Sequence, residues 1–344
     1  MRTEALETFV QRVFVKLGIA EDPARLVAAA LVEADLEGIA SHGVMLLPMY
    51  VDRMMAGSVS KAVEGKVVHD AGPAIVIDAG HALGQLTSDQ ATRLAVARAR
   101  THGMASVAVR NGFHFGTAGY WARRIASEGL VGIAMCNTRP LMPAPGGAQR
   151  LVGNNPLAVA LPSTENAFLV DMALSASAMG KIRLAESAGK PIPPGWAADE
   201  NGQPTTDPAA AIKGMLLPAA GPKGFGLAAA IDLLCGGLSG GAVGEEVGML
   251  YGDPAKPYGC AHLFIAIDPG RFGARDAAAR LDHRVKKFSD KIRNSKRAPG
   301  TPRIYAPGDL EQARRAEHGA ECPVAPEVVE KLKECGARLG VVLS

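Results

Sequence analysis

Apolar residues recur at helical spacing through the amino-terminal part of the chain. One face of the first expected helix is formed by Leu6, Phe9, Val10, Val13, Phe14 and Leu17. Gly18 can end this helix, because glycine readily adopts the left-handed backbone of a helix C-terminus. A second helix is expected to begin with Asp22 as its cap and to end before Gly38, and a third is expected over 47–55. The amino-terminal region is therefore predicted to be helical.

From residue 74 onward, apolar stretches typical of strands alternate with stretches of helical spacing. Strands are expected over 74–79, 105–109, 131–136, 157–161, 168–172 and 262–267. Helices are expected over 88–102, directly after Gly116, and over 225–234. The turn at 162–166 joins two strands as a hairpin, which favours a mixed sheet over a purely parallel one. The alternation predicts an α/β fold in which helices cover a mixed sheet.

The rest of the chain divides into a proline-rich segment and a helical end. Residues 190–208 hold five prolines and are expected to form a long ordered loop or lid. Carboxy-terminal helices are expected over 274–294, 310–317 and 327–339. We expect an α/β nucleotide-binding core over 73–273. Residues 1–72 together with 274–344 are expected to form a helical substrate and dimer region.

The composition excludes several classes of protein. Of the 344 residues, 48% are hydrophobic and 21% are charged, and 40 are glycine, which is typical of a soluble globular α/β chain. The net charge is only +3, and the basic segment 284–297 has helical spacing and includes Asp290. A solvated helix face explains that segment better than a nucleic-acid surface. No apolar stretch is long enough to span a bilayer, so we expect neither a nucleic-acid nor a membrane partner.

The cysteines and the amino terminus point to the cytoplasm. The five cysteines are widely spaced, at positions 136, 235, 260, 322 and 335. They form no CxxC pair, so neither a disulfide framework nor a cysteine zinc site is expected. The first residues open directly into an acidic amphipathic helix, unlike a signal or transit peptide. The histidines show no HxxxH, HxH or HExxH spacing, so we also expect no metal site.

His114 is the first candidate for chemistry. It follows an apolar strand-like stretch and precedes a helix, and glycines flank the turn that carries it. An imidazole there can exchange a proton near neutral pH, as a general acid or base does. The alternative is a structural histidine whose ring is hydrogen-bonded on the loop.

Two further segments could bind a ligand. Ser41 and His42 lie side by side between helices and could meet a phosphate or a carboxylate, although a helix-capping serine beside a surface histidine is the simpler interpretation. The sequence from Gly224 to Ala229 fits GxGxxA, but no buried strand precedes it, which disfavours a Rossmann fold. The start of that helix, with Lys223 beside it, could still hold an anion. An ordinary helix start is the alternative.

Several motifs in a fixed order resemble one known family. They are Ser41-His42-Gly43-Val44 with Pro48 and Tyr50, the segments 111–121, 153–156 and 171–175, Gly180-Lys181, the segment 191–195, Lys223-Gly224 and Pro307-Gly308. Together they resemble the malate and L-lactate dehydrogenase family of the second type, which has its own non-Rossmann α/β fold. The family also includes ureidoglycolate and sulfolactate dehydrogenases and reductases of cyclic 2-imino acids.

The resemblance implies an NAD- or NADP-dependent oxidoreductase that works as a homodimer, whose partner contributes to the active site. His114 would be the general acid and base while hydride moves between the nicotinamide and C2 of a 2-oxo or 2-hydroxy acid. Ser41 and His42 would line the site. The implied cofactor contacts are Thr138, Met172, Ala173, Leu174, Lys181, Lys223, Pro307, Gly308 and Asp309. The sequence does not choose between NAD and NADP.

One departure from the family pattern concerns the substrate. The family usually has arginine four residues after the histidine of Ser-His-Gly, where it binds the substrate carboxylate, and this chain has Leu46. We expect Arg139 to supply the missing anchor; a surface arginine is the alternative. The branch resembling hydroxycarboxylate dehydrogenase B also has an apolar residue there, which favours 2-oxo acids with larger side chains. A reductase of cyclic 2-imino acids, a metal-dependent hydrolase and a non-catalytic binding protein stay open as alternatives.

Overall fold

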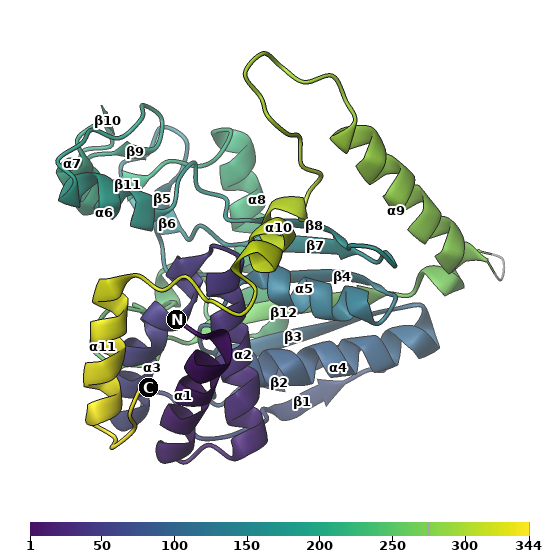
Figure 1. The fold of residues 1–344 in the computed structure, drawn as a ribbon, viewed down its shortest axis with the longest axis horizontal. Helices are drawn as coiled ribbons and strands as arrows, with labels where there is room; N and C mark the ends of the chain where they lie inside the picture. Colours follow the sequence, from purple (N-terminus) through teal and green to yellow (C-terminus); the bar gives the residue numbers. More distant parts are fainter. Residues whose placement is uncertain (274–275, 344) are drawn as a thin grey trace.

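A seven-stranded sheet organises the middle of the computed structural model, which describes residues 1–273 and 276–343 (Figure 1). Its strands, in spatial order, are β1 (Lys66–Asp70), β2 (Ala74–Asp78), β3 (Met104–Gly112), β12 (Cys260–Ile267), β4 (Val131–Cys136), β7 (Leu157–Leu161) and β8 (Phe168–Met172). β2 and β3 run parallel, and every other neighbouring pair is antiparallel. The predicted mixed sheet and the hairpin of β7 and β8 are confirmed.

Helices cover both faces of this sheet. α4 (Gly84–His102) and α5 (Ala118–Ser127) lie on one face (Figure 1). α4 can approach closely because small, fully buried alanines recur at one-turn spacing, at positions 91, 95 and 99. α8 (Pro222–Asp232) and the π-helical turn Leu233–Gly237 cover the other face. Alternate residues of β12 serve the two faces: Phe264 packs toward α4 and α5, and Leu263 toward α8.

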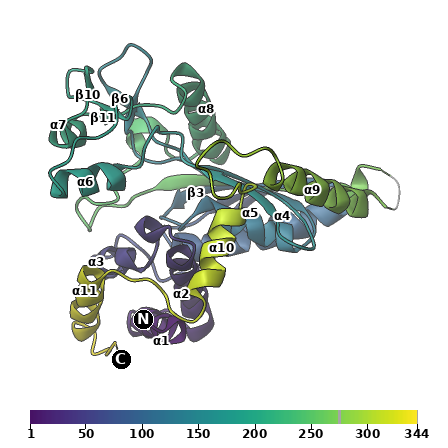
Figure 2. The same ribbon diagram turned by 45° about the horizontal axis from the view of Figure 1, so that its top comes forward.

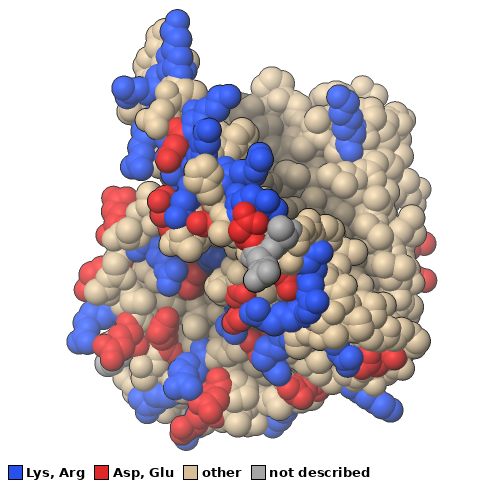
Figure 3. Space-filling model, turned by 90° about the vertical axis from the view of Figure 1, so that its right-hand side faces the viewer, with Lys and Arg blue, Asp and Glu red and all other residues tan. Residues whose placement is uncertain are grey.

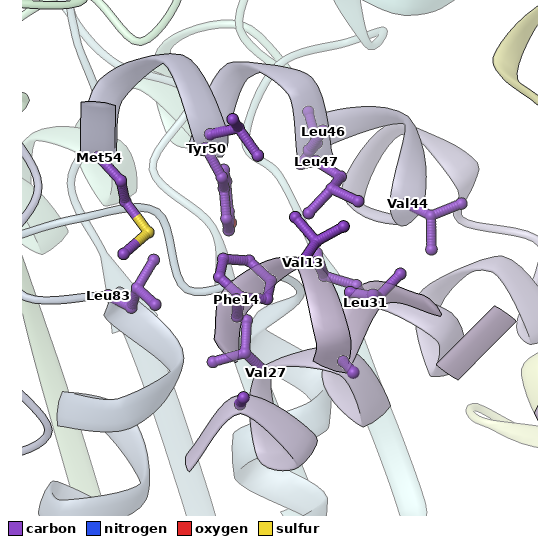
Figure 4. Packing of buried hydrophobic residues seen from close by; sticks show 14 of the residues in the cluster. Val13, Phe14, Val27, Leu31, Val44, Leu46, Leu47, Tyr50, Met54 and Leu83 are labelled. Carbon is purple, nitrogen blue, oxygen red and sulfur yellow. The ribbon is translucent and has the colours of Figure 1, made fainter. Parts of the chain in front are cut away.

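A separate apolar core holds the helical region together. It is built by α1 (Thr3–Lys16), α2 (Glu21–Leu36), α3 (Leu47–Met55) and α11 (Pro326–Ala337). Figure 4 shows Val13, Phe14 and Leu31 from the first two helices meeting Leu46 and Tyr50. The two ends of the chain lie close together, and α11 packs on α3 (Figure 1).

The predicted cap of α2 is wrong. The helix begins at Glu21, its cap is Ala20 and no side chain caps it. Asp22 instead lies in the first turn, where its carboxylate accepts a hydrogen bond from Arg25 (2.5 Å). Its negative charge also interacts favourably with the positive end of the helix dipole. The predicted end of α1 is right, because Gly18 has a φ of +96°.

A small lobe is formed by the segments that the chain inserts between β4 and β7 and between β8 and β12, and it differs from the prediction of a long loop. Residues 190–208 include β9 (Ala197–Ala198) and β10 (Pro204–Thr205), which form a small sheet with β11 (Met215–Leu216). Strands of two residues show no alternation of polarity, so the sequence pattern could not reveal them. The lobe also contains α6 (Met179–Ser187), α7 (Pro208–Lys213), β5 (Met142–Pro143) and β6 (Arg150–Val152). α6 buries only Ile182, in the core that the lobe shares with α8, and it presents no apolar stripe that would have predicted it.

The three predicted carboxy-terminal helices are present. α9 (Ala277–Arg293) lies along the sheet edge beside β8, and its upper end leads into an extended loop (Figures 1 and 2). The predicted start of this helix at 274 lies outside the described residues. α10 (Asp309–His318) follows the loop and precedes α11. The basic side chains of α9, among them Arg284, Lys287 and Lys291, are exposed as predicted (Figure 3).

Candidate active site

His114 lies on the turn between β3 and α5, as predicted. The turn leaves β3 through Asn111, whose left-handed backbone (φ +52°) is held by hydrogen bonds from its side chain to both oxygens of Asp78 (3.0 and 3.1 Å). It then packs tightly against the start of α4. A side chain in place of Gly84 would bring its Cβ within 2.2 Å of the carbonyl oxygen of Phe113. The close packing fixes where the imidazole can lie.

The imidazole of His114 is held through Nδ1. The hydroxyl of Tyr50 lies 2.7 Å from Nδ1, and the backbone N–H of Gly116 donates to the same nitrogen (3.3 Å). Because Nδ1 accepts from Gly116, the hydrogen of the neutral ring is on Nε2. Burial lowers the pKa of His114 well below its usual range, and the neighbouring His42 and His262 lower it further.

His42 lies beside His114. The two rings are stacked, with 5.4 Å between centroids and 30° between planes. The Ser41 hydroxyl lies 3.0 Å from Nδ1 of His42, and burial lowers the pKa of this histidine too. The structure therefore brings together the two histidines that the sequence singled out, whereas Ser41 is exposed, contacts His42 and does not line the cavity that the histidines share. Ser41 does not cap the short helix that contains it.

Asp35 supports the turn that carries His42. Its buried carboxylate accepts a hydrogen bond from the backbone N–H of Val44 (2.7 Å). A side chain at Gly43 would place Cβ 2.2 Å from this carboxylate, which explains the glycine after His42. Desolvation raises the pKa of Asp35 to about 7, although the Val44 hydrogen bond lowers it.

His42 and His114 open onto a cavity of about 220 Å³ between the helical region and the sheet. Its walls are Ile39, residues 115–118, Cys136, Thr138, Asn154, Pro156, residues 171–173, Ala178, Tyr258, Cys260 and His262. Most of these groups are apolar, and the polar ones face the same space. Such a cavity is typical of a small-molecule site.

Asp171 contributes the carboxylate of this cavity. It accepts a hydrogen bond from the N–H of Gly119 (2.8 Å) at the start of α5, where a side chain in place of the glycine would collide with the carboxylate. The residue as a whole is exposed to solvent, yet desolvation of its carboxylate by the surrounding protein raises the pKa of Asp171 to about 6. The sequence motif contained Asp171, but nothing in the pattern showed that it would face His114 across one cavity.

The floor of the cavity is uncharged. His262 is fully buried and stacks on Phe115, with 4.5 Å between ring centroids, and its Nε2 lies 3.2 Å from Sγ of Cys260. Burial lowers the pKa of His262 to about 3 and raises the pKa values of the Cys136 and Cys260 thiols. Among the described residues, no three His, Cys, Asp or Glu side chains gather in a geometry that could hold a metal ion.

Comparisons with known proteins extend over almost the whole chain. The profile of the malate/L-lactate dehydrogenase family matches residues 1–333. L-sulfolactate dehydrogenase of Methanocaldococcus jannaschii is 35% identical over 341 residues, covering 99% of this chain and 97% of that protein. Hydroxycarboxylate dehydrogenase B of Escherichia coli K12 is 36% identical over 320 residues, covering 91% and 87%. The chain belongs to the malate/L-lactate dehydrogenase family.

Solved structures agree with this assignment. The sulfolactate dehydrogenase from M. jannaschii superposes with a TM-score of 0.93 at 34% identity, covering 100% of this chain and 98% of that one. A Δ1-piperideine-2-carboxylate reductase from Pseudomonas syringae pv. tomato gives 0.85 at 28%, covering 97% and 99%. The predicted fold and family are confirmed, and the chain is an NAD- or NADP-dependent hydroxy acid oxidoreductase, as expected. The sulfolactate and hydroxycarboxylate enzymes are almost equally similar to it, so identity favours neither branch.

Some residues that the family resemblance assigns to the cofactor do line the cavity. Thr138 is positioned by its N–H, which donates to Asn155 (2.8 Å), and by its hydroxyl, which donates to Asn154 (3.0 Å). Met172 and Ala173 line the cavity wall. The Leu174 side chain is buried in the core beneath, so only its backbone is near the cavity wall.

Lys181 and Lys223 are exposed at the starts of α6 and α8, outside the cavity. A β-bridge between Ser175 and Pro218 brings the cavity wall next to the segment that leads into α8. A second hollow, of about 530 Å³, is lined by residues 143–148, 201–203, 217–218 and 220–222 and also touches Ala176 and Gly195. Gly224 lies inside α8, where a Cβ would collide with the Ala219 carbonyl; it is a packing glycine, consistent with a non-Rossmann fold.

The remaining assigned residues lie elsewhere. Pro307 accepts a hydrogen bond from the N–H of Leu169, which places the turn of Pro307 and Gly308 against β8. The Asp309 carboxylate is held by two hydrogen bonds from Arg293 (2.8 and 2.7 Å), and these lower its pKa. The structure thus gives this carboxylate a role in anchoring α10.

Leu46 and Arg139 differ in their surroundings. Leu46 is 2% exposed, packs in the helical core and does not line the cavity (Figure 4). Arg139 is half-buried and close enough to the cavity residue Tyr258 to interact with it electrostatically, but it does not itself line the cavity. Within the described part of the chain its guanidinium has no carboxylate or hydrogen-bond partner. Burial lowers the pKa of Arg139, and the nearby Arg150 and Arg183 lower it further.

Proposed function

We propose that this enzyme interconverts a 2-oxo acid and a 2-hydroxy acid, with His114 as the proton donor and acceptor. One observation carries the proposal. Tyr50 and Gly116 both bind Nδ1 of His114, so Nε2 is the nitrogen left for a substrate in the cavity. A protonated imidazole there can neutralise the charge that grows on the carbonyl oxygen during reduction, and the neutral ring can take the proton back.

The cavity fits a nicotinamide ring together with a small acid. Its apolar walls suit a planar ring, and Thr138, Asn154 and Asp171 supply polar groups at its edge. The bridge of Ser175 to Pro218 leads from this wall toward the start of α8, where Lys223 and helix N–H groups can face phosphates. When bound, the nicotinamide supplies or accepts the hydride. The residues of the chain orient the two reactants, exclude water and move the proton.

Arg139 is our candidate for the substrate carboxylate. Its electrostatic interaction with the cavity residue Tyr258 and its lack of a partner in the described structure support this role, which requires the side chain to reach into a cavity that it does not line in this structure. The predominantly apolar walls suit an acid with a larger apolar side chain better than an acid with a second carboxylate. Arg139→Leu is expected to raise KM for the oxo acid at least tenfold, with Arg139→Lys losing less because it keeps the charge. An unchanged KM in Arg139→Leu would remove the assignment.

We further propose that a second copy of the chain covers α8. Leucines at 227, 233, 234 and 238 are exposed along α8 and its π-helical turn, and Leu233 and Leu238 are each 61% exposed. An apolar stripe of this kind is typical of an interface between subunits. Leu233→Asp is expected to convert a dimer to monomer in sedimentation velocity. Leu184→Asp, at an exposed leucine of α6, is the control; dimers in both variants would place the interface elsewhere.

We also propose that the enzyme is located in the cytoplasm. All five cysteines are free and buried, which fits a reducing environment. No described helix combines the length and apolarity that a membrane crossing requires.

Reduction of cyclic 2-imino acids is a second candidate, because Asp171 faces the same cavity with a raised pKa. A carboxylic acid there could exchange a proton with a nitrogen. The test of both functions follows NADH and NADPH absorbance with a panel of 2-oxo acids and one cyclic imino acid. Turnover that requires an oxo acid supports the first proposal, and turnover of the imino acid alone supports the second. No turnover with either cofactor would overturn both.

A further inference from the structure

A fully buried pair of side chains lies behind His114. Tyr50, from α3, and Gln85, from α4, are both 0% exposed. The Tyr50 oxygen has three neighbours: Nδ1 of His114 at 2.7 Å, the backbone carbonyl oxygen of His114 at 3.3 Å, and Nε2 of Gln85, which donates to it at 3.0 Å. The hydroxyl therefore joins the helical region, the sheet layer and the candidate catalytic turn at one atom.

The hydrogens at this junction can be counted. A phenol has one hydrogen to donate and two positions that accept, and Gln85 occupies one of the latter. When His114 is neutral with its hydrogen on Nε2, Tyr50 donates to Nδ1. When His114 is protonated, Nδ1 also has a hydrogen and needs an acceptor. The N–H of Gly116 cannot accept, whereas the free position on the Tyr50 oxygen can.

We propose that Tyr50 is a positioning residue that holds His114 in one orientation in both protonation states by reversing this hydrogen bond. In the protonated state Nδ1 donates to the Tyr50 oxygen, and the Tyr50 hydrogen turns to the His114 carbonyl oxygen. No proton leaves Tyr50 in this exchange. Nε2 thus faces the cavity before and after it gives its proton to substrate. The proposal rests on the role of His114 in the proposed function.

Two observations support this reversal. Burial raises the pKa of Tyr50, so the phenol stays protonated and acts only through its hydrogen bonds. The groups at this junction are also held by regular or closely packed backbone: Tyr50 lies on α3, Gln85 on α4, and both atoms of His114 belong to the turn packed against the start of α4. A reversal therefore needs only rotation of one O–H bond.

Gln85 determines how strongly the Tyr50 oxygen can accept a hydrogen bond from the protonated His114. Its N–H points at the same oxygen that must accept from the charged imidazole, so it competes with that bond. The Gln85 carbonyl oxygen is buried and has no partner in the described structure. Replacement of Gln85 by Met removes both groups while keeping a similar shape, which leaves no new polar atom without a partner.

Other titrating groups surround the ring and must be separated from this effect. His42 stacks on it, His262 is close by, and the cavity also holds Asp171, Tyr258, Cys136 and Cys260. The thiols and Tyr258 have raised pKa values, and that of His262 is about 3. Of these groups, His42 and Asp171 are the ones whose titration could overlap with that of His114. A signal from the His114 ring itself is therefore needed.

The test titrates protein labelled with 15N in histidine, using two-bond 1H–15N spectra that report ring protonation and tautomer. His114→Gln identifies the His114 signals by their loss. In the wild type we expect the hydrogen of the neutral ring on Nε2. Tyr50→Phe removes the acceptor, so the pKa of His114 should fall by about 1 pH unit or more, or the ring should stay neutral to the lowest pH at which the fold persists.

Gln85→Met should move the pKa of His114 the other way, upward, because the Tyr50 oxygen is freed for the imidazolium. Opposite shifts are the result expected. A shift of the His114 pKa in the same direction in both variants, or no shift in either, would overturn the proposal. If Tyr50→Phe does not fold, Gln85→Met decides alone, with an unchanged or lower pKa as the contrary result. These spectra need no turnover, so failure of the proposed function would show separately, as absent NADH and NADPH oxidation by the wild type.

Discussion

The cavity at His114 and the helix α9 contain ionisable side chains in opposite surroundings. In and around the cavity, His42, His114 and His262 have lowered pKa values, because protein atoms replace water around them. On α9, basic residues such as Arg284 and Lys287 are exposed to solvent (Figure 3). The contrast teaches that burial, more than residue type, decides which ionisable groups can carry chemistry or determine stability.

The largest contrast is expected between two histidines. His114→Ala should lower kcat about 10²- to 10⁴-fold, because the proton donor is lost, while His283→Ala on the exposed face of α9 should leave kcat unchanged. Steady-state rates at saturating oxo acid and cofactor measure this. Equal loss in both variants, or none in His114→Ala, would break the distinction between the two regions.

Two arginines give the next contrast, in stability. Arg53 is 1% exposed and donates hydrogen bonds to the carbonyl oxygens of Met249, Leu250 and Lys256. Arg53→Met leaves these carbonyls without partners and should cost about 3 kcal/mol of unfolding free energy. Arg284→Met should stay within about 0.5 kcal/mol. Denaturant unfolding checks both, and a mild effect at Arg53 would mean that the loop rearranges around the loss.

A smaller, pH-dependent contrast concerns two aspartates. The folded pKa of Asp35 is about 7, above its ordinary 3.8, so the folded state binds the additional proton between these values. Stability should therefore fall as pH rises from about 4 to 7 and stay level above that. The shift corresponds to about 4 kcal/mol at pH 8, but an amide oxygen accepts more weakly from the Val44 N–H than a carboxylate does, so Asp35→Asn should gain about 1–2 kcal/mol on the wild type there and little at pH 4. Asp290→Asn on α9 is the control; the same gain there would remove Asp35 as the cause.

Much of the fold could be predicted from the order of apolar and polar residues alone, in those segments where burial requires apolar side chains at regular positions. β3, β4 and β12 were predicted because most residues of their apolar runs are buried between the two layers of helices. β2 was predicted although only alternate residues, Ile75 and Ile77, are buried, because its run is apolar throughout. β1 was missed because every one of its residues is exposed, so no alternation marks it. The strands of the small lobe were missed because they are too short for a pattern.

The site followed from the sequence only in part. The turn context and the family motifs identified His114, His42 and Thr138, all of which line the cavity. The contact of Tyr50 with His114 joins residues 64 apart in the chain, and only the packing of α3 against the sheet layer creates it. The placement of Leu46 in the helical core likewise depends on packing that no local pattern records.

The most direct test of hydride transfer in this cavity uses deuterium. The wild-type enzyme is given a 2-oxo acid from the panel with NADH or NADPH that carries deuterium at both positions of C4 of the nicotinamide, and the product is examined by mass spectrometry and NMR. We expect one deuterium on C2 of the hydroxy acid, and a sharp loss of that product in His114→Ala. A product without deuterium at C2, or no product from any acid with either cofactor, would contradict the proposed reaction.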